Sequence, residues 1–181
     1  MSEKMRKKHR LFKSVATLTL AAMLTAMSVV IGIFCKNFLN FGMGLFRITF
    51  ENLPIILSGI MLGPVCGGVV GCASDLISYF LSSQVYPPNL IVTLGATTVG
   101  VASGIVSRYL DKKRGNVQII ISGGLAHILG SMIIKPIGLF QFYSFAVLWR
   151  IPLYLLIAPL EIMLICLMFK NKTFRHLIDS L

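Results

Sequence analysis

The chain has 181 residues, of which 56% are hydrophobic and only 13% are charged, with a formal net charge of +11. A soluble domain needs a charged surface that this composition cannot supply, so we predict one integral membrane domain spanning residues 1–181. Most Lys and Arg residues lie at the two ends and in one loop. This pattern indicates membrane topology and not a nucleic-acid-binding surface.

Six apolar segments predict an all-α membrane protein, a bundle of six transmembrane helices at about residues 14–34, 50–63, 65–82, 89–107, 117–137 and 145–169. The first segment follows the basic segment 1–13 and resembles a signal peptide. Its apolar stretch is too long for one and further spans follow, so we expect a helix. The second and third segments are short, and we expect them to tilt little or to stop short of one membrane interface.

The distribution of Lys and Arg predicts the orientation of the bundle. Six of these residues lie in residues 4–13, four in 108–114 and three in 170–175. An even number of spans places all three clusters on one side, which we expect to be cytoplasmic, together with the C-terminal tail 170–181. Four cations then fall at the outer ends of helices or in outer loops, where this rule does not explain them: Lys36, Arg47, Lys135 and Arg150.

Residues four positions apart share a helix face, and small residues on such a face allow helices to pack closely in lipid. Ala22 and Ala26 repeat this pattern in the first segment. In the third and fifth segments polar residues continue the row of glycines: Gly67, Gly71, Asp75 and Tyr79, and Gly123, His127, Ser131 and Lys135. Asp75 facing hydrocarbon would cost roughly 2.5–3.5 kcal/mol, so we expect it to face a protein interior or cavity.

The polar residues of the outer half form one candidate substrate-binding set: Arg47, Glu51, Asn52, Asp75, Tyr79, Tyr86, Asn89, His127, Lys135, Trp149 and Arg150. Such a pocket suits an anion at its mouth and a flat, donor-rich group below, against which aromatic side chains could stack. Each residue alone can also be an interface anchor, and His127 alone is more often a helix–helix hydrogen bonder. For Glu161, deeper in the sixth segment, we expect a donor within the bundle or a facing partner.

Motifs for catalysis are not found in the sequence. It contains no G-x-x-x-x-G-K-[ST], G-x-S-x-G or H-E-x-x-H pattern, so neither ATP hydrolysis through a phosphate loop nor intramembrane proteolysis is predicted. The four cysteines form no C-x-x-C pair and are interpreted as small apolar residues. We therefore predict no enzyme activity, no cofactor and no metal site.

The stretch "ITFENLPIILSGIMLGPVCGGVVGCASDLISYF" resembles the substrate-binding S components of energy-coupling-factor (ECF) vitamin transporters, and the folate type in particular. Its most specific part is the G-P-x-x-G-G-x-x-G-x-x-x-D pattern from Gly63 to Asp75. The resemblance implies a subunit of the bacterial cell membrane that binds one vitamin on the outside. It also implies a transmembrane coupling protein and two ATPase subunits as partners, with Ala22 and Ala26 of "AMLTA" docking on the coupling protein.

A folate ligand would use the polar set in a definite way. Its two carboxylates would meet Arg47, Lys135 or Arg150, and the N–H edge of its pterin would meet Asp75 or, as second choice, Glu51. Whether Glu51 faces the ligand or pairs with a neighbouring cation stays open at this stage. The alternatives are an S component for another vitamin or a modified-base precursor, and a stand-alone secondary transporter.

Overall fold

The computed structural model describes residues 15–41, 46–82, 89–110 and 115–171 of the chain. Its elements, in chain order, are α2 (Val15–Phe38), β1 (Asn40–Phe41), β2 (Phe46–Arg47), α3 (Asn52–Leu62), α4 (Pro64–Leu81), α5 (Leu90–Tyr109), α6 (Asn116–Ala126), the π-helix η2 (His127–Ile134), α7 (Lys135–Tyr143), the 3-10 helix η3 (Ser144–Trp149) and α8 (Arg150–Lys170). The predicted helical fold is confirmed, apart from two short antiparallel strands that pair Asn40 with Arg47.

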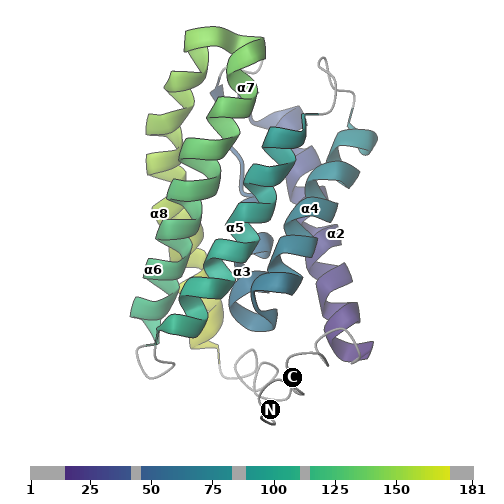
Figure 1. Ribbon diagram of the computed structural model, residues 1–181, viewed down its shortest axis with the longest axis vertical. Coiled ribbons are helices and arrows are strands. Elements are labelled where there is room, and N and C mark those ends of the chain that lie inside the picture. Colours follow the sequence, from purple (N-terminus) through teal and green to yellow (C-terminus); the bar gives the residue numbers. More distant parts are fainter. Residues whose placement is uncertain (1–14, 42–45, 83–88, 111–114, 172–181) are drawn as a thin grey trace, which may run out of the picture.

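The helices form one elongated bundle, with α2 and α4 on one side, α5 near the middle, and α6, η2, α7 and α8 on the other (Figure 1). The segments α6, η2 and α7 follow one another without a break and make one long helix. The start of α2, the end of α5, the start of α6 and the end of α8 all lie at the lower end of Figure 1. The helix ends next to the three basic clusters therefore share one end of the bundle, as the charge pattern predicted.

Five helical segments are long and apolar enough to cross a membrane: 15–38, 64–81, 90–109, 116–141 and 151–170. The second predicted span is different, because α3 has only 11 residues, and at 1.5 Å per residue it covers about half of a hydrocarbon core of ~30 Å. Since α2 and α4 both run upward in Figure 1, the chain between them returns through β2, an extended stretch and α3. Five of the six predicted spans are therefore helices with the length and apolar composition that crossing a membrane requires, and the second is a short helix inside the bundle.

The junction between α3 and α4 depends on Gly63 and Pro64. Gly63 has a φ of 96°, a left-handed value that glycine adopts without the steric cost of a Cβ atom. Pro64 occupies the first turn of α4, where its missing N–H leaves no hydrogen bond unmade. A Cβ atom on Gly63 would also lie 2.1 Å from a guanidinium nitrogen of Arg108 at the end of α5. This turn therefore brings α3, α4 and α5 together at the lower end.

Close packing of α4 against α5 confirms the predicted role of the small residues. A Cβ atom on Gly100 would lie 2.0 Å from the carbonyl oxygen of Gly67, so the two backbones are in direct contact. Ile56, Val70 and Val99 fill the interior beside this contact. Large apolar side chains on the outside of α2 and α8 stay exposed, as is expected of surfaces that face lipid.

Candidate functional site

Lys135, at the start of α7, is the centre of a buried polar cluster. Its Nζ lies 3.2 Å from Oε1 of Glu51 and 3.0 Å from Oδ1 of Asn52, and the Asn52 amide donates to Oγ of Ser131 at 3.3 Å. Lys135 is 3% exposed and Asn52 is fully buried. The cation and the acid thus compensate each other away from solvent, where an unpaired charge would be very costly. We call Glu51, Asn52, Ser131 and Lys135 the lysine cluster.

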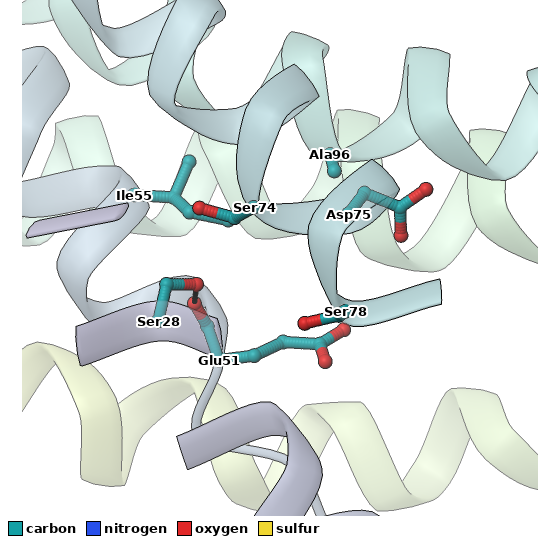
Figure 2. A pocket seen from close by; sticks show the side chains of 7 residues that line it. All are labelled: Ser28, Glu51, Ile55, Ser74, Asp75, Ser78 and Ala96. Carbon is teal, nitrogen blue, oxygen red and sulfur yellow. Dashed lines mark hydrogen bonds between the residues drawn. The ribbon is translucent and has the colours of Figure 1, made fainter. Parts of the chain in front are cut away.

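A small polar cavity adjoins the lysine cluster between α2, α3, α4 and α5. It has a volume of about 10 Å³ and is lined by Ser28, Glu51, Ile55, Ser74, Asp75, Ser78 and Ala96 (Figure 2). Ser28 donates a hydrogen bond to the backbone oxygen of Glu51 at 2.7 Å, which ties α2 to the start of α3. The Glu51 carboxylate extends toward Ser78, and both side chains lie next to Gly32 of α2.

Asp75 lies on the same cavity and confirms the prediction that this acid faces the protein interior. Its Oδ2 accepts a hydrogen bond from the Thr93 hydroxyl at 2.7 Å, which links α4 to α5. Two carboxylates, Glu51 and Asp75, therefore line one cavity together with three serine side chains. Such a lining offers mainly hydrogen-bond acceptors and hydroxyls, and it suits a ligand edge rich in N–H donors.

The cavity itself is much smaller than a site for a vitamin. A volume of about 10 Å³ is barely enough for one water molecule, whereas pockets for small organic ligands have roughly 300–1,000 Å³. Ligand recognition is therefore inferred from the carboxylates and hydroxyls that line the cavity, and not from its present size. Within the described part of the chain, no group of three or more His, Cys, Asp or Glu side chains is placed to hold a metal ion.

Three of the residues that the sequence singled out have identifiable contacts. The Asn89 side chain accepts from the backbone N–H of Ile91 at 2.9 Å, capping α5, and its amide also donates to the carbonyl oxygen of Gly138 in α7. Tyr79 stacks edge-on against Phe80, with ring centroids 5.6 Å apart. Lys36, one of the four cations that the charge rule does not explain, donates to Ser82 at the end of α4.

Other predicted residues cannot be placed in the cluster. Tyr86 lies outside the described residues, and so do the side chains of Arg47, Trp149 and Arg150. Their backbones are described: Arg47 ends β2, Trp149 ends η3 and Arg150 begins α8. Since β2 packs against α8, the backbone positions of the two arginines belong to neighbouring elements.

His127 lies two turns below Lys135 on the same long helix and does not line the cavity. Its Nε2 lies 2.7 Å from Oε2 of Glu161 in α8, and both side chains are fully buried. His127 therefore makes a helix–helix contact, in line with the alternative interpretation of this residue, and its ring is the group of the bundle that Glu161 meets. Glu161 is an isolated acid in a long apolar segment, and this pattern indicated that it needs a polar partner within the bundle.

Sequence reasoning missed several hydroxyl residues. Ser28, Ser74 and Ser78 line the cavity, and Thr93 holds Asp75. Two of them could have been found from their spacing. Ser74 and Ser78 are four residues apart, so they share a helix face, and this face lies beside Asp75.

Apolar helices of spanning length, together with two carboxylates and a lysine held in the interior, define a multi-pass membrane protein with a polar internal site. The sequence model of the family described as "ECF transporter, substrate-specific component" matches residues 16–178. The chain therefore belongs to the family of substrate-specific components of ECF transporters, whose members are transporter subunits and not enzymes.

Two known proteins are similar to this chain. The "Folate transporter FolT" of Clostridium novyi (strain NT) is 27% identical over 115 residues, which are 63% of this chain and 64% of that protein. The match thus spans less than two thirds of the relative's length. The crystal structure of FolT bound with folic acid superposes with a TM-score of 0.68 at 22% identity, covering 88% of this chain and 95% of that one. The second likeness shows that the two proteins share a fold.

Proposed function

We propose that this chain is the folate-binding S component of an ECF importer. The observation that carries the proposal is the pair of carboxylates, Glu51 and Asp75, on one internal cavity. The 2-amino-4-oxo pyrimidine edge of a pterin presents adjacent N–H groups, for which a carboxylate is a well-matched acceptor. The similarity to the folate transporter of Clostridium novyi supports the same ligand.

The lysine cluster changes the expected division of roles. Because Lys135 already holds Glu51 and Asn52, it is less suited to meeting the carboxylates of a folate tail. We assign that role to Arg47 and Arg150, whose backbones belong to the neighbouring elements β2 and α8. Asp75 stays the first choice for the pterin edge, since the only hydrogen bond described for it comes from the neutral Thr93 hydroxyl.

Binding of a molecule as large as folate requires the cavity to widen. Two sides of the cavity are held together by few polar contacts among the described residues and can separate. On one side Ser28 of α2 donates to the backbone of Glu51. On the other side Thr93 of α5 donates to Asp75 of α4. The α4–α5 contact below them is backbone against backbone and leaves no room to move. We therefore propose that the site opens toward the upper end of Figure 1.

ATP-driven import by this chain would take its energy from partner subunits, since the sequence has no phosphate loop. We propose a transmembrane coupling protein and two ATPase subunits, in the bacterial cell membrane, with the lower end of the bundle in Figure 1 facing the cytoplasm. Ala22 and Ala26 lie exposed on α2, where small side chains would let a partner helix approach closely.

The proposal is tested by titrating the purified protein in lipid nanodiscs with folate, followed by calorimetry. Saturable binding at or below micromolar folate is expected, with thiamine and riboflavin as comparison ligands. No saturable folate binding at micromolar concentrations would contradict the proposal. Saturable binding of another vitamin in its place would favour an S component of different specificity.

A further inference from the structure

His127 and Glu161 form a second buried polar pair, outside the cavity that the proposed function uses. The Nε2–Oε2 contact of 2.7 Å joins η2 to α8, and neither side chain is exposed. Beyond this ion-pair contact, neither ring nitrogen of His127 and neither carboxylate oxygen of Glu161 makes a hydrogen bond within the described residues. A pair of apolar residues at these positions would avoid that desolvation and is often as stable or more so. Stability alone therefore does not account for the pair.

The helix that carries His127 has an unusual geometry from this residue onward. Residues His127–Ile134 form a π-helix, and the backbone N–H of Lys135 donates to the carbonyl oxygen of Gly130, five residues back. Long π-helical stretches are rare, because their hydrogen-bonded turns are wider than those of an α-helix. Something in the structure must hold this register.

Both ends of η2 are attached to neighbouring helices by buried polar contacts. At its start, His127 is attached to Glu161 of α8. Within it and just after it, Ser131 and Lys135 are attached to Asn52 of α3. The buried side chains His127, Ser131 and Lys135 lie at intervals of four residues, while Ile128, Leu129 and Ile133 face outward.

We propose that His127 and Glu161 are a positioning pair, which fixes the register of η2 and thereby holds Ser131 and Lys135 against Asn52 and Glu51. The pair does not touch the ligand. It acts through Lys135, which neutralises and orients the Glu51 carboxylate on the cavity wall. The ligand-related part of this inference rests on the proposed function, whereas the effect on Lys135 does not.

The first test needs no ligand and measures the protection of Lys135 against reductive methylation, read by mass spectrometry. In the unaltered protein Lys135 stays unlabelled, and the half-buried Lys36 serves as internal reference. Glu161→Leu is expected to expose Lys135 to labelling. Glu161→Gln, whose amide can keep a polar contact with His127, is expected to keep it protected. Leu160→Ala, which alters the outward face of α8, is the matched control and should leave Lys135 unlabelled.

The double variant His127→Leu/Glu161→Leu separates positioning from folding, because an apolar pair restores packing without the directional contact. Its melting temperature should stay within a few degrees of the unaltered protein, while Lys135 becomes labelled. If Lys135 stays protected in this variant and in Glu161→Leu, the pair does not position it and the inference is wrong.

The second test is the folate dissociation constant. Glu161→Leu is expected to raise it about tenfold, or ~1.4 kcal/mol, and Glu161→Gln to leave it within roughly threefold. In a Lys135→Met background, Glu161→Leu should cause little further change, because the residue through which the pair acts is already gone. Additive losses would overturn the inference. Absence of folate binding by the unaltered protein would contradict the proposed function only, since the labelling test decides the inference without ligand.

Discussion

Lys135 and Glu51 lie 84 positions apart in the chain, yet their charged atoms approach to 3.2 Å inside the bundle. The contact joins the start of α7, inside the long α6–η2–α7 helix, to the start of α3. It brings into one place a cation that membrane topology did not explain and an acid at the edge of an apolar segment. Glu51 is thus paired with a neighbouring cation, one of the two interpretations that the sequence left open, and it also lines the cavity; its contact with a ligand stays a prediction.

Replacing Lys135 by Met is expected to lower stability, because it removes the buried ammonium group that contacts the Glu51 carboxylate and the Asn52 side chain. The loss should be about 3 kcal/mol, near the lower end of the range for breaking a buried pair. Thermal unfolding in detergent measures it. Lys36→Met is the matched control, since Lys36 is only half-buried and donates to groups at the end of α4. Equal losses for the two variants would contradict a special role for the lysine cluster.

Replacing Asp75 by Asn is expected to weaken folate binding while keeping the fold. The amide has nearly the same shape and its oxygen still accepts from Thr93, but its NH₂ group repels a donor edge of the ligand. A lost charge-assisted hydrogen bond of ~1.5–3 kcal/mol corresponds to roughly a ten- to hundredfold higher dissociation constant. Calorimetric titration measures it. Thr98→Val is the control, because Thr98 only bonds back to its own helix. Unchanged affinity of the Asn variant would remove Asp75 from the site.

Two glycine substitutions should differ sharply. Gly100→Ala places a Cβ atom 2.0 Å from the Gly67 carbonyl, a clash of backbone with backbone that no rotamer change can relieve. We expect it to cost about 1–3 kcal/mol or more by forcing α4 and α5 apart. Gly124→Ala meets no atom within 4 Å and should be neutral or stabilising by up to ~1 kcal/mol through helix propensity. Melting temperatures of the two variants compare them directly; similar values would show that the α4–α5 contact tolerates separation.

Replacing both Ala22 and Ala26 by Trp should abolish transport and assembly with the coupling protein but leave folate affinity unchanged. These residues are exposed on α2 and lie outside the lysine cluster. Co-purification with the coupling protein, vitamin uptake by cells and titration of the isolated subunit give the three readings. Leu155→Trp/Leu156→Trp on the exposed face of α8 is the control. Assembly that survives in the α2 variant would show that the partner docks elsewhere.

Periodicity and charge were sufficient to predict much of this fold. Apolar segments located the helices, because spanning length is fixed by membrane thickness. Spacing by four located the glycine face of α4, where Gly67 meets Gly100 of α5, and the cost of a charge in lipid placed Asp75 inside. These are properties of single segments, and a sequence displays them directly.

Contacts between distant segments could not be predicted in the same way. A pattern shows that Lys135 faces inward but not that Asn52 and Glu51 are the groups it meets. The π-helical register of η2 depends on contacts at both of its ends, so the sequence of this segment alone does not predict it. His127 lies on the predicted face of its helix, the one that also carries Lys135. It was wrongly grouped with the outer polar residues, because it lies two turns away from Lys135 along that face, beside Glu161.

The shortness of α3 has a consequence for how this protein is made. Nine of its 11 residues are buried, and it packs against α2, α4, α5, α6 and α8. A segment of this length cannot cross a bilayer alone, and the extended backbone before it would leave peptide groups unsatisfied in hydrocarbon. Its position must therefore be acquired after the longer helices have inserted and begun to associate. A substitution that separates those helices would then change the path of the chain through the membrane as well as the stability of the finished protein.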